Sequence, residues 1–342
     1  PPPPPPPPPP FQAEDGIRDS VNGLVGSEMC IRDRCYRAIR VGMKPTDRPA
    51  DARHGSTPVE DVLAPNPGPL TLDGTRTWLV GSGTVVLIDP GPALPEHLAR
   101  VQAAVSGRGV DAILLTHAHA DHAGGAAAAA RAFGAPVMAS SATLARTGLA
   151  GRVLREGDTV PVGGSGTVEL MDGSITLQVI ETPGHAADHI SFLLLPDRWL
   201  FTGDLVLGEG SSAVLHPDGR MSEYLASIRK LEALRPARLL PGHGPPVDEA
   251  VARLGAYRRH RLDRERQIEL ALENGSRTVS EIREAVYGPL DPGLQAAADA
   301  SISAHLVHLR ERGLEAPEPG AGMFETLAPP AERDDRLEGG TP

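Results

Sequence analysis

The chain has 342 residues and a formal net charge of −11, and only 3% of its residues are aromatic. An acidic surface repels phosphate backbones, which argues against broad, non-specific nucleic-acid binding. The two cysteines, Cys30 and Cys35, lie near the start, so no disulfide or thiolate ligand is expected in the rest of the chain. The sequence has no apolar run of ~18 residues and no signal-peptide pattern, so we expect a cytoplasmic protein without a membrane partner.

The first 42 residues show no periodic apolar pattern. Ten prolines are followed by FQAEDGIRDSVNGLVGSEMCIRDR (Phe11 to Arg34), which resembles translated sequencing-adapter sequence. A genuine disordered extension is the alternative. We therefore expect residues 1–42 to be a non-native or disordered extension, and residues 43–61 to form a loose linker.

Deletion of residues 1–42 is expected to change neither the melting temperature nor the activity. The segment offers no periodic apolar face, so it has little surface to bury against the rest of the chain. Thermal unfolding and activity assays on the full chain and on a chain beginning at Met43 test this. A marked loss of stability or soluble yield would show that the segment belongs to the folded structure.

Residues 62–249 combine strand and helix patterns. Short apolar runs such as TVVLI (Thr84–Ile88) indicate strands buried on both faces, and Gly and Asp turns between Val153 and Glu181 indicate a β-meander. The elements predicted outside the meander are strands at 77–80, 84–88, 112–115, 136–139, 190–195, 199–202 and 238–240, and helices at 93–106, 123–133 and 222–234. This interleaving predicts an α/β fold, an αββα sandwich of two packed sheets with helices outside.

Residues 250–328 have a different, mainly helical pattern. Helices are predicted at 248–274, 278–286 and 294–312, and a capping box, Thr278-Val-Ser-Glu281, begins the second. Leu314 and residues 323–327 could supply the two strands of a wing. The pattern therefore predicts a small winged-helix domain, followed by a disordered tail at 329–342.

The segment His117-Ala-His119-Ala-Asp121-His122 follows a predicted buried strand directly. Imidazole and carboxylate groups are zinc ligands. In an extended loop His117 and His119 lie on one side, while Asp121 and His122 begin a helix and can point the other way. One segment could thus serve two ions. A histidine-rich surface loop is the alternative, but four such residues at the end of a core strand argue against it.

Three more candidate ligands follow predicted strands: His185 in TPGH, Asp204 in FTGD and His243 in PGHG. Glycine and proline beside each permit sharp turns and close backbone approach. Each residue alone would be an ordinary loop residue. Their occurrence together with the first motif favours a shared metal site.

The motifs HxHxDH, TPGH, GD and GH, in this order across residues 62–249, resemble the metallo-β-lactamase superfamily. The resemblance implies two Zn²⁺ ions, with other divalent metals as alternatives. It implies these ligands: His117, His119 and His185 at one site, Asp121, His122 and His243 at the other, and Asp204 bridging both. Asp89, at the end of TVVLID, matches the family's first motif and is implied to support the metal loop; a plain strand-end turn residue is the alternative.

Two bridged zinc ions would supply hydroxide at neutral pH and stabilise negative charge on the substrate. The expected activity is therefore hydrolysis, with Asp121 and Asp204 as catalytic residues and Asp121 orienting the nucleophile. The missing cysteine at position 204 argues against the commonest class B β-lactamases. His119, where flavodiiron proteins have glutamate, favours zinc over redox iron. The short segment between Asp204 and His243 has no room for an inserted nuclease domain.

Further segments, LAPNPGPLTLDGT, GHAADHISF and GDLVLGEGSS, resemble the lactamase-β-like group that contains a mitochondrial endoribonuclease. Asp188 and His189 are candidates for supporting or substrate-facing roles, with ordinary loop polarity as the alternative. Arg76 stands where the resemblance predicts asparagine, which leaves the local turn and a substrate contact open.

The leading function predicted from sequence is a zinc-dependent phosphodiesterase or endoribonuclease acting on single-stranded RNA. A thioesterase or acyl-ester hydrolase of the hydroxyacylglutathione hydrolase kind is the alternative, and a non-catalytic metal-binding protein is the alternative of another class. The arginine-rich stretch 258–266 could receive an anionic substrate or form internal ion pairs. The helical domain could be a pocket lid, a homodimerisation module or a nucleic-acid contact.

Overall fold

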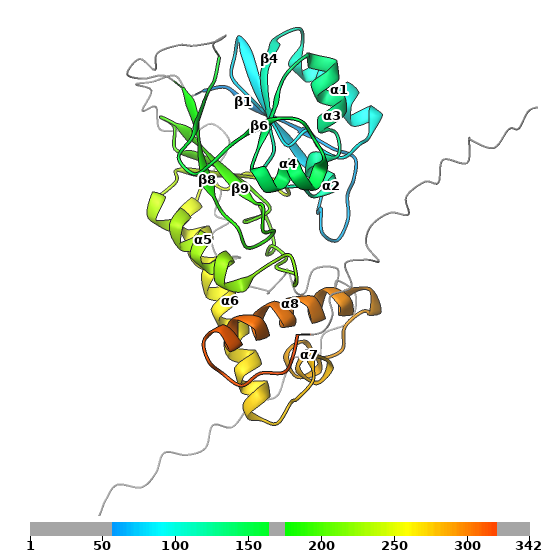
Figure 1. Cartoon of the computed structure of the whole chain (residues 1–342), viewed down its shortest axis with the longest axis vertical. Coiled ribbons are helices and arrows are strands. Elements are labelled where there is room, and N and C mark those ends of the chain that lie inside the picture. Colours follow the sequence, from blue (N-terminus) through cyan, green and yellow to red (C-terminus); the bar gives the residue numbers. More distant parts are fainter. Residues whose placement is uncertain (1–56, 164–174, 320–342) are drawn as a thin grey trace, which may run out of the picture.

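The computed structural model describes residues 57–163 and 175–319. Within these residues the strands form a six-stranded sheet of order β1-β2-β3-β4-β5-β6 and a five-stranded sheet of order β11-β10-β9-β8-β7 (Figure 1). The first sheet comprises β1 (Val59–Leu63), β2 (Arg76–Val80), β3 (Thr84–Ile88), β4 (Gly109–Leu114), β5 (Val137–Ala139) and β6 (Arg152–Val153). The second comprises β7 (Thr159–Pro161), β8 (Thr176–Glu181), β9 (Ile190–Leu195), β10 (Trp199–Gly203) and β11 (Arg238–Pro241).

Side chains alternate between the two faces of each strand, and this alternation builds the layers of the sandwich. In β3, Val86 and Ile88 pack between the sheets with Phe192 of β9, while Val85 and Leu87 face the helices outside. Because successive strand residues point to opposite faces, a strand that is apolar on both faces must be covered on both.

Helices cover the outer face of each sheet. Those on the first sheet are α1 (Pro95–Val105), α3 (Ala126–Phe133) and α4 (Ser141–Thr147), and α2 (Ala120–Ala123) precedes α3. The second sheet packs against α5 (Met221–Leu234) and the first half of α6 (Ala250–Glu273). The predicted αββα sandwich is thus confirmed.

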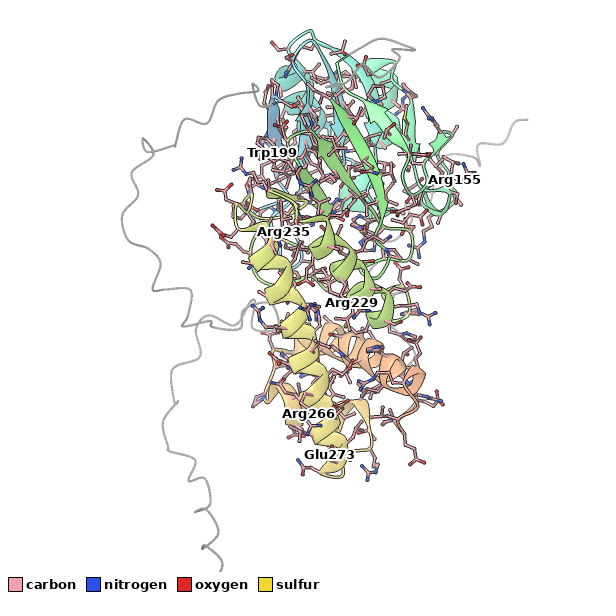
Figure 2. The ribbon with its side chains drawn as sticks, turned by 90° about the vertical axis from the view of Figure 1, so that its left-hand side faces the viewer. Arg155, Trp199, Arg229, Arg235, Arg266 and Glu273 are labelled. Carbon is pink, nitrogen blue, oxygen red and sulfur yellow. The ribbon has the colours of Figure 1, made fainter. Side chains whose placement is uncertain are left out.

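The C-terminal helices form a second, smaller core. The distal half of α6 packs against α7 (Val279–Tyr287) and α8 (Pro292–Glu311) through Ile268, Ile282 and Ile302. Figure 2 shows α6 running from the sandwich into this unit, with Arg266 and Glu273 on its distal part. Ala304 of α8 also packs with the core around α5, so the helical unit is docked on the sandwich.

Several predicted boundaries need correction. Strand β1 begins at Val59, inside the predicted linker, because it pairs with β2 from Val59 opposite Val80. The predicted helix 123–133 is two helices, α2 and α3, separated by Gly124 and Gly125. A Cβ on Gly125 would lie 2.9 Å from the carbonyl oxygen of Pro90, so glycine lets the Asp89 loop approach. Helix α4 was not predicted.

The three predicted C-terminal helices are confirmed, whereas the wing is not. Residues 314–319 form no strand, so the wing strand expected at Leu314 is wrong. Residues 323–327, the predicted tail at 329–342, residues 1–56 and the middle of the expected meander lie outside the described residues. The winged-helix domain therefore stays a prediction. No helix in the described part of the chain has the length and apolar character needed to cross a lipid bilayer.

Candidate metal centre

The candidate ligands converge because the C-terminal ends of four strands meet at one end of the sandwich. Strands β3 and β4 are parallel, as are β10 and β11, and β8 ends beside the start of β9. The segments that follow β4, β8, β10 and β11, with the short helix α2 among them, carry every residue of the seven-residue set predicted from sequence. That set forms two groups: His117, His119, His185 and Asp204, and Asp121, His122 and His243.

In the first group the four ligand atoms lie within 4.8 Å of one another. Nε2 of His185 is 3.2 Å from Nδ1 of His119 and 3.8 Å from Oδ2 of Asp204. In the second group Nε2 of His243 is 3.3 Å from Nε2 of His122 and 3.2 Å from Oδ2 of Asp121. Two tetrahedral ligands at zinc distance are about 3.4 Å apart, so this spacing fits a metal ion in each group.

Asp204 faces both groups. Its Oδ2 faces His185, while its Oδ1 lies 3.2 Å from Nε2 of His122 and 3.3 Å from Nε2 of His243. Within the described residues, Oδ1 of Asp204 and Nε2 of His117 are buried without a hydrogen-bond partner. Buried polar atoms normally have partners, so these two atoms are suited to a ligand such as a metal ion.

Hydrogen bonds orient four of the imidazoles so that Nε2 is free to bind a metal. Nδ1 of His122 bonds Asp89 at 2.9 Å, that of His243 bonds the Gly74 carbonyl at 3.0 Å, and that of His185 bonds the Ala213 carbonyl at 2.7 Å. Nδ1 of His117 contacts the hydroxyl of Thr116 at 2.9 Å. His119 is reversed: its Nδ1 faces the cluster. Such outer contacts fix ring orientation and ligand basicity at metal sites.

The electrostatics of the centre favour charged carboxylates. Burial alone raises the pKa of Asp121, but His122 and His243 more than offset it and bring that pKa to about 2. Burial and the neighbouring His119 lower the pKa of His185 to about 4, so its imidazole is neutral and can donate a lone pair at neutral pH. Deprotonated carboxylates and neutral imidazoles are the forms that bind zinc. Burial lowers the pKa of His243, but Asp204 and Asp121 more than offset it and raise that pKa to about 9, so this imidazole would have to release a proton to bind zinc.

The family described as "Metallo-beta-lactamase superfamily" matches residues 70–243 of this chain. The chain belongs to this superfamily. The Beta-lactamase-like protein 2 homolog of Caenorhabditis elegans is 31% identical and the alignment covers 80% of this chain and 88% of that protein. The Atrochrysone carboxyl ACP thioesterase of Aspergillus fumigatus is 32% identical over 67% of this chain and 73% of that protein.

Among solved structures, a beta-lactamase domain protein from Burkholderia ambifaria has a TM-score of 0.65 at 22% identity, covering 79% of this chain and 91% of that chain. At this level of identity, the structural similarity shows a shared fold and nothing about function. Together with the family match and the assembled His/Asp groups, it makes this chain a metallo-β-lactamase-superfamily hydrolase with a potential for metal binding.

Asp89 lies beside the candidate metal centre, in contact with the segment that carries the HxHxDH motif. It is buried, and its carboxylate accepts hydrogen bonds from the backbone N–H of Thr116 at 2.8 Å and from the Thr116 hydroxyl at 2.7 Å. It also accepts from Nδ1 of His122. Asp89 therefore ties the start of the HxHxDH loop to one of its histidines.

His189 and Asp188 have different surroundings. Nε2 of His189 accepts the backbone N–H of Asp204 at 3.2 Å, while its Nδ1 contacts the hydroxyl of Thr182 at 2.9 Å. It therefore positions the Asp204 loop. Asp188 points away from the ligand groups: its carboxylate accepts from Thr143 and Arg146 of α4, each at 2.8 Å. Neither side chain joins the ligand groups.

Sequence reasoning missed a network that reaches His119. Arg146 forms ion pairs with both Asp188 and Asp218, and Oδ2 of Asp218 lies 3.8 Å from Nε2 of His119. Thr75 was also missed; its hydroxyl is 3.4 Å from Oδ2 of Asp121. An arginine in a short helix and an aspartate in a loop carry no sequence signal that would connect them.

Arg76 replaces the asparagine that the resemblance predicts, and it takes a structural role. Its Nε donates to the carbonyl of Gly244 at 2.6 Å, and its guanidinium pairs with Asp61 and Asp73. Arg76 therefore holds the loop that carries His243, and its guanidinium is engaged on β1 and on the turn before β2.

Proposed function

We propose that this chain is a binuclear zinc hydrolase whose substrate is an acyl thioester. The proposal of two zinc ions is supported by Asp204, whose two carboxylate oxygens face two separate groups of candidate ligands. The thioester reading is supported by a relative named as a carboxyl ACP thioesterase, which is 32% identical over 67% of this chain. Ion pairs on the surface of α6 also favour an acyl thioester over RNA.

The proposed ligands follow the two groups. One zinc ion would be held by His117, His119 and His185, the other by Asp121, His122 and His243, and Asp204 would bind both. Zinc held there would lower the pKa of a bound water to about 7 and would polarise a carbonyl group. The side chains of His119 and Asp121 are 34% and 27% exposed, against 11% for Asp204, so the substrate would approach on their side.

The protein's own residues would orient the reacting groups. The Asp121 carboxylate, ionised at neutral pH, can accept a hydrogen bond from the attacking water. A thiol leaving group has a pKa of about 8.5, so cleavage of a thioester makes little demand on a general acid. A ribose oxygen is a much poorer leaving group.

Three basic residues of α6 are held by contacts within the protein, which leaves them less available to an RNA backbone. Arg258 pairs with Glu232 at 2.9 Å, Arg266 pairs with Glu269 at 3.2 Å, and Arg253 donates to the carbonyl of Leu207. These contacts support the internal ion pairs that the sequence analysis kept as an alternative to an anionic binding surface. Together with the net charge of −11, they favour a small acyl substrate over RNA.

A parallel assay of the zinc-loaded chain tests the proposal. We expect kcat/KM for an acyl N-acetylcysteamine thioester to exceed that for a β-lactam by at least about tenfold, with single-stranded RNA cleaved more slowly at low salt. The Asp204→Asn variant, purified in the same way, controls for contaminating enzymes. Faster RNA cleavage would favour the endoribonuclease alternative, and no turnover of any substrate would favour a non-catalytic metal-binding protein.

A further inference from the structure

A cavity lies at the junction of the sandwich and the helical unit. Its walls come from the loop around residue 70, the segment 211–215 after β10, and helices α6, α7 and α8. The basic and larger apolar side chains in these walls include Leu215, His260, Arg261, Arg264, Tyr287 and Leu294. Apolar side chains therefore surround three basic groups.

The basic groups are buried. Arg261 is 5% exposed and Arg264 is 7% exposed. The guanidinium of Arg264 lies 4.0 Å from the ring centroid of Tyr287, and that of Arg261 lies 5.5 Å from the ring centroid of Tyr224. The cavity walls in the described part of the chain carry no acidic side chain. Buried cations without a carboxylate in the same cavity favour an anionic ligand.

Three side-chain nitrogen atoms at this cavity have no hydrogen-bond partner among the residues that the structure describes. They are Nε of Arg261 and both ring nitrogens of His260, each buried. Burial and the neighbouring Arg261 and Arg264 lower the pKa of His260 to about 3, so the ring is neutral and one nitrogen is a donor. Leaving buried donors unsatisfied costs free energy, and an oxyanion in the cavity would satisfy them.

The cavity shares a wall with the candidate metal centre. Arg261 donates to the carbonyl of Ser212, and the Ser212 hydroxyl donates to the backbone carbonyl of Asp204. The next residue, Ala213, accepts from Nδ1 of His185 at 2.7 Å. A group bound by Arg261 is thus one short segment away from two of the candidate ligands.

We propose that this cavity is an oxyanion subsite that binds a carboxylate or phosphate ester carried by the substrate, using Arg261, Arg264 and His260. The part that assigns the oxyanion to the substrate rests on the proposed hydrolase function. The oxyanion has two sources, a carboxylate at the end of the acyl chain or a phosphate on the thiol carrier, and the two arms of the experiment separate them.

The first experiment measures steady-state kinetics on matched thioesters. Adipyl-N-acetylcysteamine against hexanoyl-N-acetylcysteamine tests an acyl carboxylate, and hexanoyl-coenzyme A against hexanoyl-N-acetylcysteamine tests a carrier phosphate. In one of the two pairs the wild type should prefer the charged ester. Arg264→Gln should raise KM for that charged ester about tenfold, while its kcat and both kinetic constants of the uncharged ester change little. Arg264→Lys, which keeps the charge, should retain part of the preference. Arg266→Gln, on the exposed face of the same helix (Figure 2), is the matched control and should behave as wild type.

The second experiment does not depend on turnover. Inorganic phosphate should raise the melting temperature of the zinc-loaded wild type and of Arg266→Gln above that in chloride at equal ionic strength, and Arg264→Gln should weaken the apparent phosphate affinity about tenfold.

Phosphate bound at zinc would stabilise all three proteins equally, so equal shifts overturn the subsite. The subsite would also be overturned if Arg264→Gln raised KM equally for charged and uncharged esters, or if Arg264→Lys and Arg264→Gln had equal effects. Either result would show that Arg264 contributes packing and not charge. If no thioester is cleaved but the phosphate effect is lost in Arg264→Gln, the thioesterase function fails while the oxyanion site stands.

Discussion

Asp204→Asn is expected to lower kcat/KM on the order of 10³-fold and to reduce bound zinc from two ions per chain to about one. The Oδ1 and Oδ2 of Asp204 face different ligand groups. Asparagine removes the negative charge and keeps a single carboxamide oxygen, so one of the two proposed metal contacts would be lost. A 10³-fold loss corresponds to about 4 kcal/mol of transition-state stabilisation, a size typical for electrostatic stabilisation in an active site. Elemental analysis and steady-state kinetics measure both effects.

Asp263→Asn is the matched control, because Asp263 is an exposed carboxylate on α6. It should keep full activity and full zinc content. The melting temperatures of the metal-free proteins should be similar, since the substitution at position 204 leaves the cores of both sheets intact. Wild-type protein that holds one zinc ion or none after supplementation would contradict the binuclear centre itself.

The two groups of candidate ligands could be predicted because their chemistry is concentrated in the sequence. Four candidate ligands lie within six residues after a buried strand, and His185, Asp204 and His243 each follow a strand beside glycine or proline. Strands of this kind end at a common edge, so the order of motifs already implies their convergence. The αββα layers could be predicted for a similar reason, because continuous apolar runs require cover on both faces.

The contacts of Arg146 could not be predicted, because they join residues far apart in sequence. Arg146 reaches Asp218 across 72 positions, and α4, which carries Arg146, is too short to show a clear period. The arginines of α6 illustrate another limit. Charged residues at helical spacing indicate a solvated face, yet Arg261 and Arg264 are buried because α7, α8 and the 211–215 segment cover that side.

Asp89 can be tested for its two alternative roles with two substitutions. Asp89→Ala is expected to lower the free energy of unfolding by about 3 kcal/mol or more, because it leaves the Thr116 amide, the Thr116 hydroxyl and Nδ1 of His122 without their buried acceptor. Denaturant unfolding of the metal-free proteins measures this. Asp111→Ala, which removes a half-buried carboxylate of β4 that accepts only from Thr84 among the described hydrogen bonds, should cost clearly less.

Asp89→Asn separates support of the metal loop from turn formation. Asp89 has φ of 51°, a left-handed conformation that asparagine tolerates as well as aspartate does. If Asp89 only formed the turn, asparagine would leave zinc affinity unchanged. Its amide nitrogen, however, cannot accept from the Thr116 hydroxyl or from Nδ1 of His122, so His122 loses the contact that presents its Nε2 to the metal. We therefore expect zinc affinity to fall about 10- to 100-fold in competition with a chelator, with a smaller loss of stability than in Asp89→Ala. Wild-type affinity in Asp89→Asn would reduce Asp89 to a turn residue.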